Sequence, residues 1–318
     1  MENKIAMIIP YFGKWPEWIG LYLYSCSRQK NIDWLFYTDC GIPQKVYPNT
    51  LFHEMSFEDY CELVSRRLSI NFVPERPYKL CDLKVFYGII HQNDLKNYEW
   101  WGFGDVDLVY GNLSLLINDK NLQQYDLLTT HVDRIAGHFT VIRKKSKYTR
   151  LCLSIPDWKE KLCDTKNFGL DENAFTRIAM TLKYKLINKL YYRIVRLFTS
   201  PNSKHYWYYK LDKLFFFWKS RILMQEFFTT FKPNPMLSCV YNSSNGDIVC
   251  PIGQISRIPM GGGKLYLHFM CFKGTPYYKT KHFWKKDFYQ IPDEFDFSKG
   301  AFVSISTDSI KILNKQAK

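Results

Sequence analysis

The chain has 318 residues, 46% of them hydrophobic, so it is long enough for one large domain or two smaller ones with a real core. That apolar content excludes disorder throughout the chain. A formal charge of +14 predicts an acidic partner: a phosphate-bearing substrate, an anionic lipid surface or nucleic acid. Nine cysteines without a Cys-x-x-Cys pair give neither a zinc pattern nor a disulfide framework, and they favour a reducing cytoplasm.

The N-terminal apolar run is short for a signal peptide and is typical of a first buried strand. Residues 5–9 form this run, Pro10 ends it, and residues 11–13 follow as a ligand-facing turn. Apolar residues at helical spacing over 18–26 predict a helix, and residues 32–37 predict the next strand. No stretch approaches about twenty uncharged apolar residues, so we expect no membrane-spanning helix.

The second strand ends at Asp39, and two helices are predicted after it, over residues 57–68 and 79–91. Asp39 lies where ligands bind in open α/β sheets, so it either accepts hydrogen bonds from a base or ribose or caps the next turn. In the second helix, Lys79 and Lys84 either contact phosphates, with Asp82 between them, or form an exposed charged face.

Two acids follow an aromatic strand predicted over residues 100–103. On an extended backbone Asp105 and Asp107 leave on the same side, at the carboxyl end of that strand. Carboxylate oxygens are ligands of Mg²⁺ and Mn²⁺, and such an ion can bridge protein and diphosphate. The pair therefore predicts a metal site for a nucleotide-sugar, with a solvated pair of turn acids as the alternative.

Further strands are predicted over residues 126–130 and 137–142, with an acceptor-facing loop at 131–134 between them. Asp171 is placed to cap a helix that continues to about residue 182. A carboxylate at a helix start is suited to act as a general base toward a sugar hydroxyl, and Glu172 is available for that task if Asp171 only caps.

A basic, aromatic-rich segment follows. Residues 177–232 contain twelve Lys and Arg against two acids, and they predict two amphipathic helices around a Ser-Pro-Asn-Ser break. This segment suits an anionic membrane or a lipid-linked phosphate, or else forms a core helix pair with a basic solvated side. Near the C-terminus, residues 265–269 predict a strand that presents His268, with Lys273 behind it. His268 is either a metal ligand or an ordinary structural histidine.

The motifs at residues 8–13, Asp39, 101–107 and 268–273 together resemble those of GT-A glycosyltransferases. More narrowly, the chain is similar to the galactofuranosyltransferase module of O-antigen galactan polymerases. The resemblance covers most of residues 1–180 and resumes near 255. It implies an α/β fold of the GT-A kind, with a Rossmann-like nucleotide-binding half and a mixed sheet, to which the basic helical segment is added.

The resemblance also implies roles for individual residues. Asp107 and His268 would bind Mn²⁺ or Mg²⁺, Asp105 would reach the metal or the ribose and sugar, and Lys273 would contact the diphosphate. Glu172 or Asp171 would be the base of an inverting transfer. The residues expected on the nucleotide side are Pro10, Tyr11, Phe12, Asp39, Lys79 and Asp82.

The sequence therefore predicts a cytoplasmic enzyme, peripheral at the inner membrane, that moves a sugar from a UDP-sugar to a glycan or lipid-linked glycan in O-antigen or capsule synthesis. We expect a core over 1–181, the basic segment over 182–235 and a part completing the site over 236–318, with no nucleic acid as partner. The alternatives are a non-catalytic basic module for anionic lipid or nucleic acid, and a metal-dependent phosphohydrolase.

Overall fold

The computed structural model describes residues 5–131, 133–179, 221–225, 238–249, 264–269, 284, 287–306 and 308–313. They fall into two compact units, each built from separate stretches of chain. The first unit comprises Met1–Pro10, Met55–Gly104 and Asp119–Glu226, and the second comprises Tyr11–Glu54, Asp105–Asn118 and Phe227–Lys318. The units are interleaved along the chain, whereas the sequence suggested contiguous segments.

The first unit contains a mixed sheet whose strands pair in the order β1-β4-β7-β6-β8. β1 pairs parallel to β4 and β6 parallel to β8, whereas β7 pairs antiparallel to both β4 and β6. These pairings confirm the predicted α/β class with a mixed sheet. The strand bounds are β1 Ile5–Pro10, β4 Trp100–Gly104, β6 Leu127–Thr129, β7 Phe139–Arg143 and β8 Ile222–Met224.

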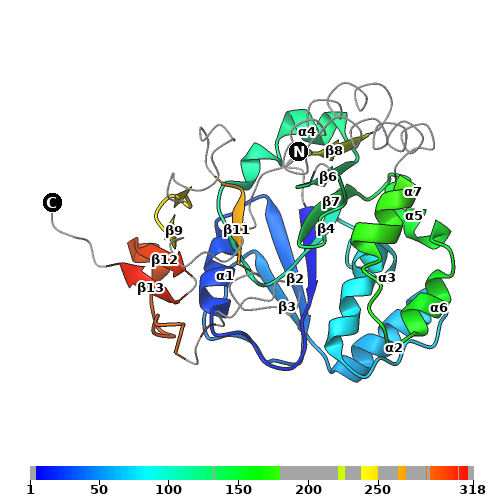
Figure 1. Cartoon of the computed structure of the whole chain (residues 1–318), viewed down its shortest axis with the longest axis horizontal. Coiled ribbons are helices and arrows are strands. Elements are labelled where there is room, and N and C mark those ends of the chain that lie inside the picture. The colour runs from blue at the N-terminus through cyan, green and yellow to red at the C-terminus, as the bar shows by residue number, and fades with distance from the viewer. Residues whose placement is uncertain are drawn as a thin grey trace, which may run out of the picture. The chain divides into compact units, whose positions relative to one another are not determined.

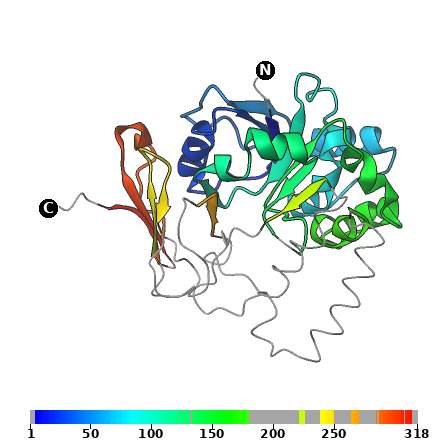
Figure 2. The ribbon, with the colours of Figure 1, turned by 90° about the horizontal axis from the view of Figure 1, so that it is seen from above.

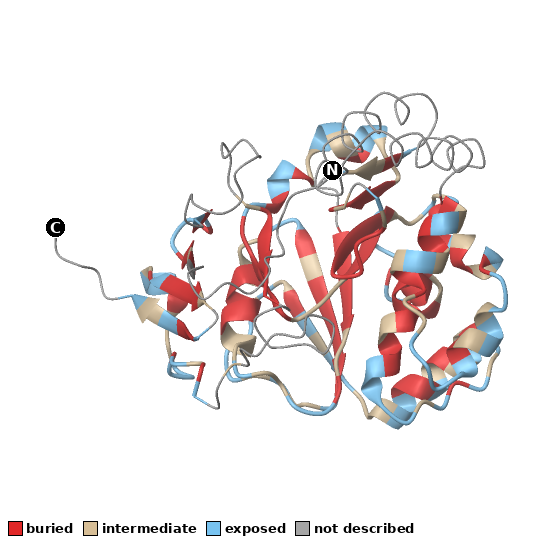
Figure 3. Ribbon diagram, viewed as in Figure 1, coloured by how far each residue is buried: buried red, intermediate tan, exposed pale blue. Residues whose placement is uncertain are grey.

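Most helices of the first unit lie to one side of β4 and β7, and α4 lies apart from them (Figure 1). Their bounds are α2 Phe57–Leu68, α3 Tyr87–Ile90, α4 Asp119–Gln124, α5 Tyr148–Leu151, α6 Trp158–Cys163 and α7 Thr176–Ala179. α2 begins as its sequence dictates, because Ser56 and Asp59 form a reciprocal capping box. The central strands are buried along nearly their whole length, as in Figure 3, so the core of this unit lies on the sheet.

The predicted helix over 79–91 is only partly right. Residues Pro77–Phe86 form a 3₁₀-helix, and the α-helical part is limited to α3. In a 3₁₀-helix residues three apart eclipse each other, which brings Lys79 over Asp82. The helix predicted from Asp171 begins with a π-helical turn, Asp171–Phe175, and continues as α7. Leu170 holds the N-cap position, and Asp171 is the first residue of the π-helical turn, where its Oδ1 accepts the backbone N–H of Glu172 at 2.8 Å.

The second unit contains α1 Ile19–Ser27, and β2 Ile32–Thr38 pairs there in parallel with β3 Thr50–Glu54. β5 Leu108–Tyr110 pairs antiparallel with β11 Tyr266–His268. A further antiparallel sheet has the order β10-β9-β12-β13, in which β9, β12 and β13 lie side by side (Figure 2). Its strands are β9 Ser238–Asn242, β10 Ile248–Val249, β12 Phe302–Ser306 and β13 Ile310–Leu313.

Candidate metal centre

The acids Asp105 and Asp107 lie in a short loop that begins directly after β4 and ends at β5. The acids follow the strand as expected, but the loop is bent, whereas an extended backbone was expected for it. β11 brings His268 beside the loop, because His268 pairs with Leu108 in the antiparallel register. The backbone N–H of Phe269 then donates to the carbonyl oxygen of Asp107 at 3.1 Å. Strand pairing thus joins residues more than 150 positions apart in sequence.

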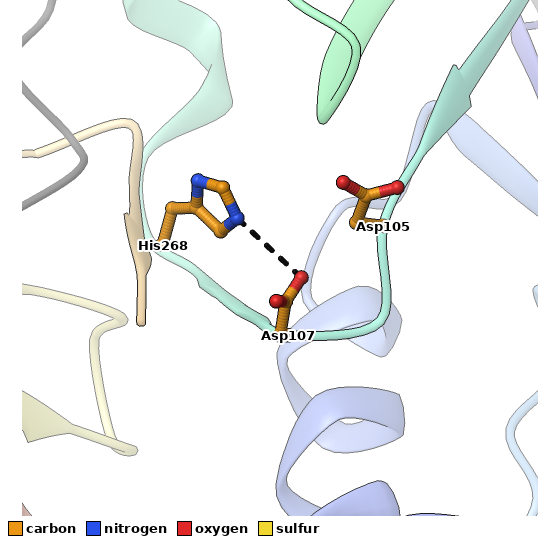
Figure 4. Close-up of side chains that lie close together, drawn as sticks. All are labelled: Asp105, Asp107 and His268. Atoms are coloured by element: carbon orange, nitrogen blue, oxygen red, sulfur yellow. Dashed lines mark ion pairs between the residues drawn. The ribbon is translucent and has the colours of Figure 1, made fainter. Parts of the chain in front are cut away.

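The side chains of Asp105, Asp107 and His268 turn toward one another (Figure 4). Each offers one ligand atom, and these atoms all lie within 4.8 Å of one another. Nε2 of His268 lies 3.5 Å from Oδ1 of Asp107. His268 and Asp107 are buried, at 2% and 5% exposure, whereas Asp105 is half-buried. Among the described residues this is the one group of three His, Cys, Asp or Glu side chains with such spacing.

This donor set fits a divalent ion. Ligand atoms on opposite sides of an ion with bonds of about 2.1 Å lie about 4.2 Å apart, so small side-chain rotations suffice to close the site. Two carboxylates offset the charge of the ion, and three protein ligands leave coordination positions for a diphosphate. Carboxylates suit Mg²⁺ and Mn²⁺, and imidazole suits divalent transition metals.

Trp18 holds the acidic loop in place, a role that the sequence did not indicate. Its indole N–H donates to the carbonyl oxygen of Val106, which lies between the two acids, at 2.8 Å. The Trp18 ring packs against Phe269, Trp284 and Phe288, with ring centroids 5.4 to 5.9 Å apart. The aromatic cluster thereby contacts both the acidic loop and the residue that follows His268. No local motif marks Trp18, since its acceptor is 88 residues away.

Tyr11 and Asp39 belong to the same unit as the three metal-ligand candidates. The Tyr11 ring stacks on Trp15 at 5.2 Å with an interplanar angle of 7°. Burial raises the pKa of Tyr11, and the Cys40 thiol, when ionised, and the Asp107 carboxylate raise it further, which puts the Tyr11 hydroxyl in the field of the acidic loop. Oδ1 of Asp39 accepts the backbone N–H of Gly13 at 2.6 Å, so this carboxylate fixes the turn after β1.

The remaining residues expected on the nucleotide side are placed as follows. Pro10 is the last residue of β1, and the Phe12 side chain is buried. Lys273 lies outside the described residues, as does nearly all of 182–235, for which the structure describes only 221–225.

Lys79 and Asp82 form a buried ion pair at 2.9 Å, so they are not the exposed charged face that was the alternative for this helix. The Lys79 ammonium also donates to the carbonyl oxygens of Lys161 and Lys166, which uses all three of its hydrogens. Asp82 accepts the backbone N–H groups of Phe168 and Leu170. These contacts favour a structural role for the pair, namely fixing the loop that leads to Asp171; binding of a phosphate stays a prediction.

Asp171 and Glu172 lie in the first unit beside Gly137. Asp171 is buried, and its carboxylate leaves no room for a side chain at Gly137. Glu172 is more accessible, with its side chain 40% exposed, and its carboxylate lies 3.3 Å from Nε of Arg134. Lys84 donates to the carbonyl oxygen of Gly137 at 2.9 Å. The predicted acceptor-facing loop, residues 131–134, therefore contacts Glu172, one of the two candidates for the general base, within this unit.

Cys239 on β9 is disulfide-bonded, whereas no disulfide framework was expected from the sequence. Spacing along the sequence does not report which cysteines the fold brings together. The free cysteines among the described residues are Cys26, Cys40, Cys61, Cys81, Cys152 and Cys163. Within the same described residues, no helix has the length and apolarity needed to cross a membrane.

Comparison with known proteins gives a family and distantly similar structures. Residues 7–296 match the model of a family described as "family of unknown function (DUF6625)". No curated protein matches the sequence. The crystal structure of galactosyltransferase LgtC in complex with donor and acceptor sugar analogues is similar over 53% of this chain and 71% of that chain, with 11% identity and a TM-score of 0.31. A TM-score this low supports no conclusion about fold or activity.

Proposed function

The chain belongs to the DUF6625 family of unknown function, and we propose, from its own site, that it is a metal-dependent glycosyltransferase using a UDP-sugar. The observation that carries this proposal is the convergence of Asp105, Asp107 and His268. The aromatic face of Tyr11 and Trp15, in the same unit, supports it, because a stacked pair of rings suits a nucleobase. We infer a GT-A fold from the α/β sheet and the position of the acids directly after β4.

In this mechanism Asp107 and His268 bind the ion, and Asp105 binds it or orients the ribose and sugar of the donor. The ion, when bound, offsets the charge that develops on the departing diphosphate. Tyr11 and Asp39 orient the nucleotide, and Trp18 keeps the acidic loop in register through its bond to Val106. Lys273 is proposed as a further diphosphate contact.

Glu172 or Asp171 is proposed to remove the proton from the acceptor hydroxyl, with inversion at the anomeric carbon. The accessibility of Glu172 favours it, since a base has to reach the acceptor, whereas Asp171 is buried against Gly137. We expect Glu172→Gln to lower kcat by roughly 10²-fold or more, as loss of a general base does. Glu160→Gln, the same change at an exposed glutamate of the same unit, is the control. An unchanged kcat in Glu172→Gln would exclude Glu172 as the base.

The donor sugar and acceptor rest on the sequence resemblance alone. They are proposed to be UDP-galactofuranose and a glycan or lipid-linked glycan of O-antigen or capsule. A panel of UDP-hexoses and UDP-galactofuranose, scored by UDP release with and without glycan, tests this part separately from the reaction class.

The reaction class is tested by thermal unfolding with UDP and with Mn²⁺, singly and together. We expect UDP to raise Tm only when Mn²⁺ is present, because the ion joins the diphosphate to the acids. Asp107→Asn should lose this effect, whereas Asp308→Asn, an exposed acid of the same unit, should retain it. Metal-independent stabilisation by UDP in Asp107→Asn would refute the assignment.

Measurement of the released products separates the alternatives. A non-catalytic binding module would release no UDP from a UDP-sugar. A phosphohydrolase would release phosphate from simple phosphoesters, but it usually holds two metal ions, and the described residues contain one ligand group.

A further inference from the structure

A pocket lies in the first unit, at the edge of the sheet where β4 begins. It has a volume of about 500 Å³, within the range of about 300 to 1,000 Å³ that encloses small molecules. Asp105 and Asp107 follow the other end of β4, so this pocket shares no residue with the candidate metal centre. The lining residues are Leu122, Gln123, Asp126, Arg143, Lys145, Ser146 and Arg221.

The base of the pocket is a carboxylate held between two guanidinium groups. Oδ1 of Asp126 accepts from Nε of Arg143 at 2.9 Å, and Oδ2 accepts from Nε of Arg221 at 2.6 Å. Arg143 also lies over the Trp100 ring at 4.5 Å and donates to the carbonyl oxygens of Leu122 and Tyr125. These contacts fix Arg143 as part of the wall and use both oxygens of Asp126.

Arg221 and Lys145 keep donors for a ligand. Arg221 uses Nε and Nη2 on Asp126 and Gln123, which leaves the two hydrogens of Nη1. Lys145 is exposed, and no acceptor among the described residues lies within hydrogen-bonding distance of its ammonium. The pocket therefore has three cations against one carboxylate, an excess of two positive charges.

Ser146 supplies an independent observation. Its hydroxyl oxygen is buried, yet it makes no hydrogen bond with any residue that the structure describes. A buried hydroxyl without a partner costs free energy, so such a group in a pocket wall indicates a ligand or water that completes it. Rotation of the Ser146 side chain about χ1 is needed to bring this hydroxyl to a ligand beside Lys145.

We propose that this pocket binds the phosphate monoester of a sugar-sized molecule. A phosphate monoester carries about 1.5 to 2 negative charges at neutral pH, which matches the excess charge of the pocket. Its oxygens accept from Lys145 and Arg221, and from Ser146 once that side chain rotates, while the organic part lies in the remaining open volume. A free sugar phosphate and a lipid with a phosphate monoester head group share this chemistry. The site needs no metal, so it is independent of the proposed transfer reaction.

The test is isothermal titration of the full chain with glucose 6-phosphate at low salt. EDTA is present, so that no divalent ion at the metal centre can bind the phosphate. Glucose is the neutral comparison. Lys145→Ala and Ser146→Ala remove pocket donors, and Lys147→Ala is the matched control, because Lys147 is an exposed lysine of the same turn that does not line the pocket. Circular dichroism checks that each variant folds.

We expect saturable binding of glucose 6-phosphate, none of glucose, and a dissociation constant raised roughly tenfold in Lys145→Ala and raised also in Ser146→Ala. Lys147→Ala should bind within about twofold of the parent chain. Equal binding in Lys145→Ala and the parent overturns the proposal. Absence of saturation on the order of 10 mM overturns it as well when the vesicles described next show no Lys145-dependent binding either. Vesicles of phosphatidylcholine with phosphatidic acid form a second arm. Lys145-dependent binding to these vesicles without binding of glucose 6-phosphate supports the site and assigns it to a lipid head group.

Discussion

The indole nitrogen of Trp18 donates to the carbonyl oxygen of Val106 at 2.8 Å, and so a residue near the N-terminus fixes the spacing of two acids in the middle of the chain. Val106 carries no chemistry itself. Its backbone is the point through which the aromatic cluster controls the directions of Asp105 and Asp107.

Trp18→Phe keeps most of the ring packing but removes this hydrogen bond. We expect a loss of about 1 kcal/mol in the free energy of unfolding and a several-fold weaker affinity for Mn²⁺, because the loop can then adopt other conformations. Urea unfolding and titration with Mn²⁺ measure the two effects. Trp15→Phe is the matched control, since Trp15 donates to the carbonyl oxygen of Gly41 at the same 2.8 Å but away from the acids. Equal loss of Mn²⁺ affinity in both variants would contradict the role given to Trp18.

Gly111→Ala tests the pairing of β5 with β11. A methyl group at Gly111 would collide with the carbonyl oxygen of Lys264, whose backbone accepts the N–H of Asn112 at 2.9 Å. The variant should therefore push β11 away, displace His268 and weaken Mn²⁺ binding while lowering Tm. Gly20→Ala in α1 meets no atom within 4 Å and should raise stability by about 0.5 to 1 kcal/mol. Unchanged Mn²⁺ binding by Gly111→Ala would show that strand pairing does not position His268.

Asp82→Ala tests the buried pair in the first unit. The substitution leaves Lys79 as an unpaired buried ammonium and deprives the N–H groups of Phe168 and Leu170 of their acceptor. We expect a loss of about 3 to 5 kcal/mol in the free energy of unfolding. Lys79→Met combined with Asp82→Leu should recover part of this loss, because no charge then remains buried. A double variant less stable than Asp82→Ala would argue against this explanation.

Cys61 gives an expectation for alkaline pH. Burial, and then the charge of Glu58, raises the pKa of Cys61 from 9.0 to about 11. Between these values the folded chain holds a proton that the unfolded chain has released, so stability is complete below about pH 9 and falls as pH rises through about 11. From about pH 8 to about pH 10.5, the free energy of unfolding measured in urea should fall by no more than about 2 kcal/mol because of this group. The fall should be smaller in Cys61→Ala. Cys163→Ala, at an exposed thiol, should keep the loss of the parent chain.

Local patterns sufficed for much of the fold. The continuous apolar run of β1, the amphipathic spacing of α2 and the aromatic run of β4 each contain their own signal, and their observed bounds lie within one or two residues of the predicted ones. The 3₁₀-helix over Pro77–Phe86 was not predictable in this way. From the sequence, Lys79 and Asp82 could be surface charges. Their burial follows from backbone groups of residues 161–170, which lie far away in sequence and bind them.

The sequence predicted the metal-ligand candidates of the site, but not the residues that hold them in place. Two acids after an aromatic strand and a late histidine indicated a metal centre, and the structure brings all three together. Trp18 was missed because its hydrogen bond joins residues of unrelated local sequence. The phosphate pocket was missed as well, since Asp126, Ser146 and Arg221 meet only through the strand pairing of β6 with β7 and β8.

The pairing of β5 with β11 can form only late in synthesis. Residues 108–110 leave the ribosome long before residues 266–268, and the intervening chain has to be made before the two strands can meet. Until then the acids have no histidine beside them, and the exposed edge of β5 is open to other strands. A nascent chain stalled before residue 266 should therefore fail to retain Mn²⁺, although its first strands are already translated.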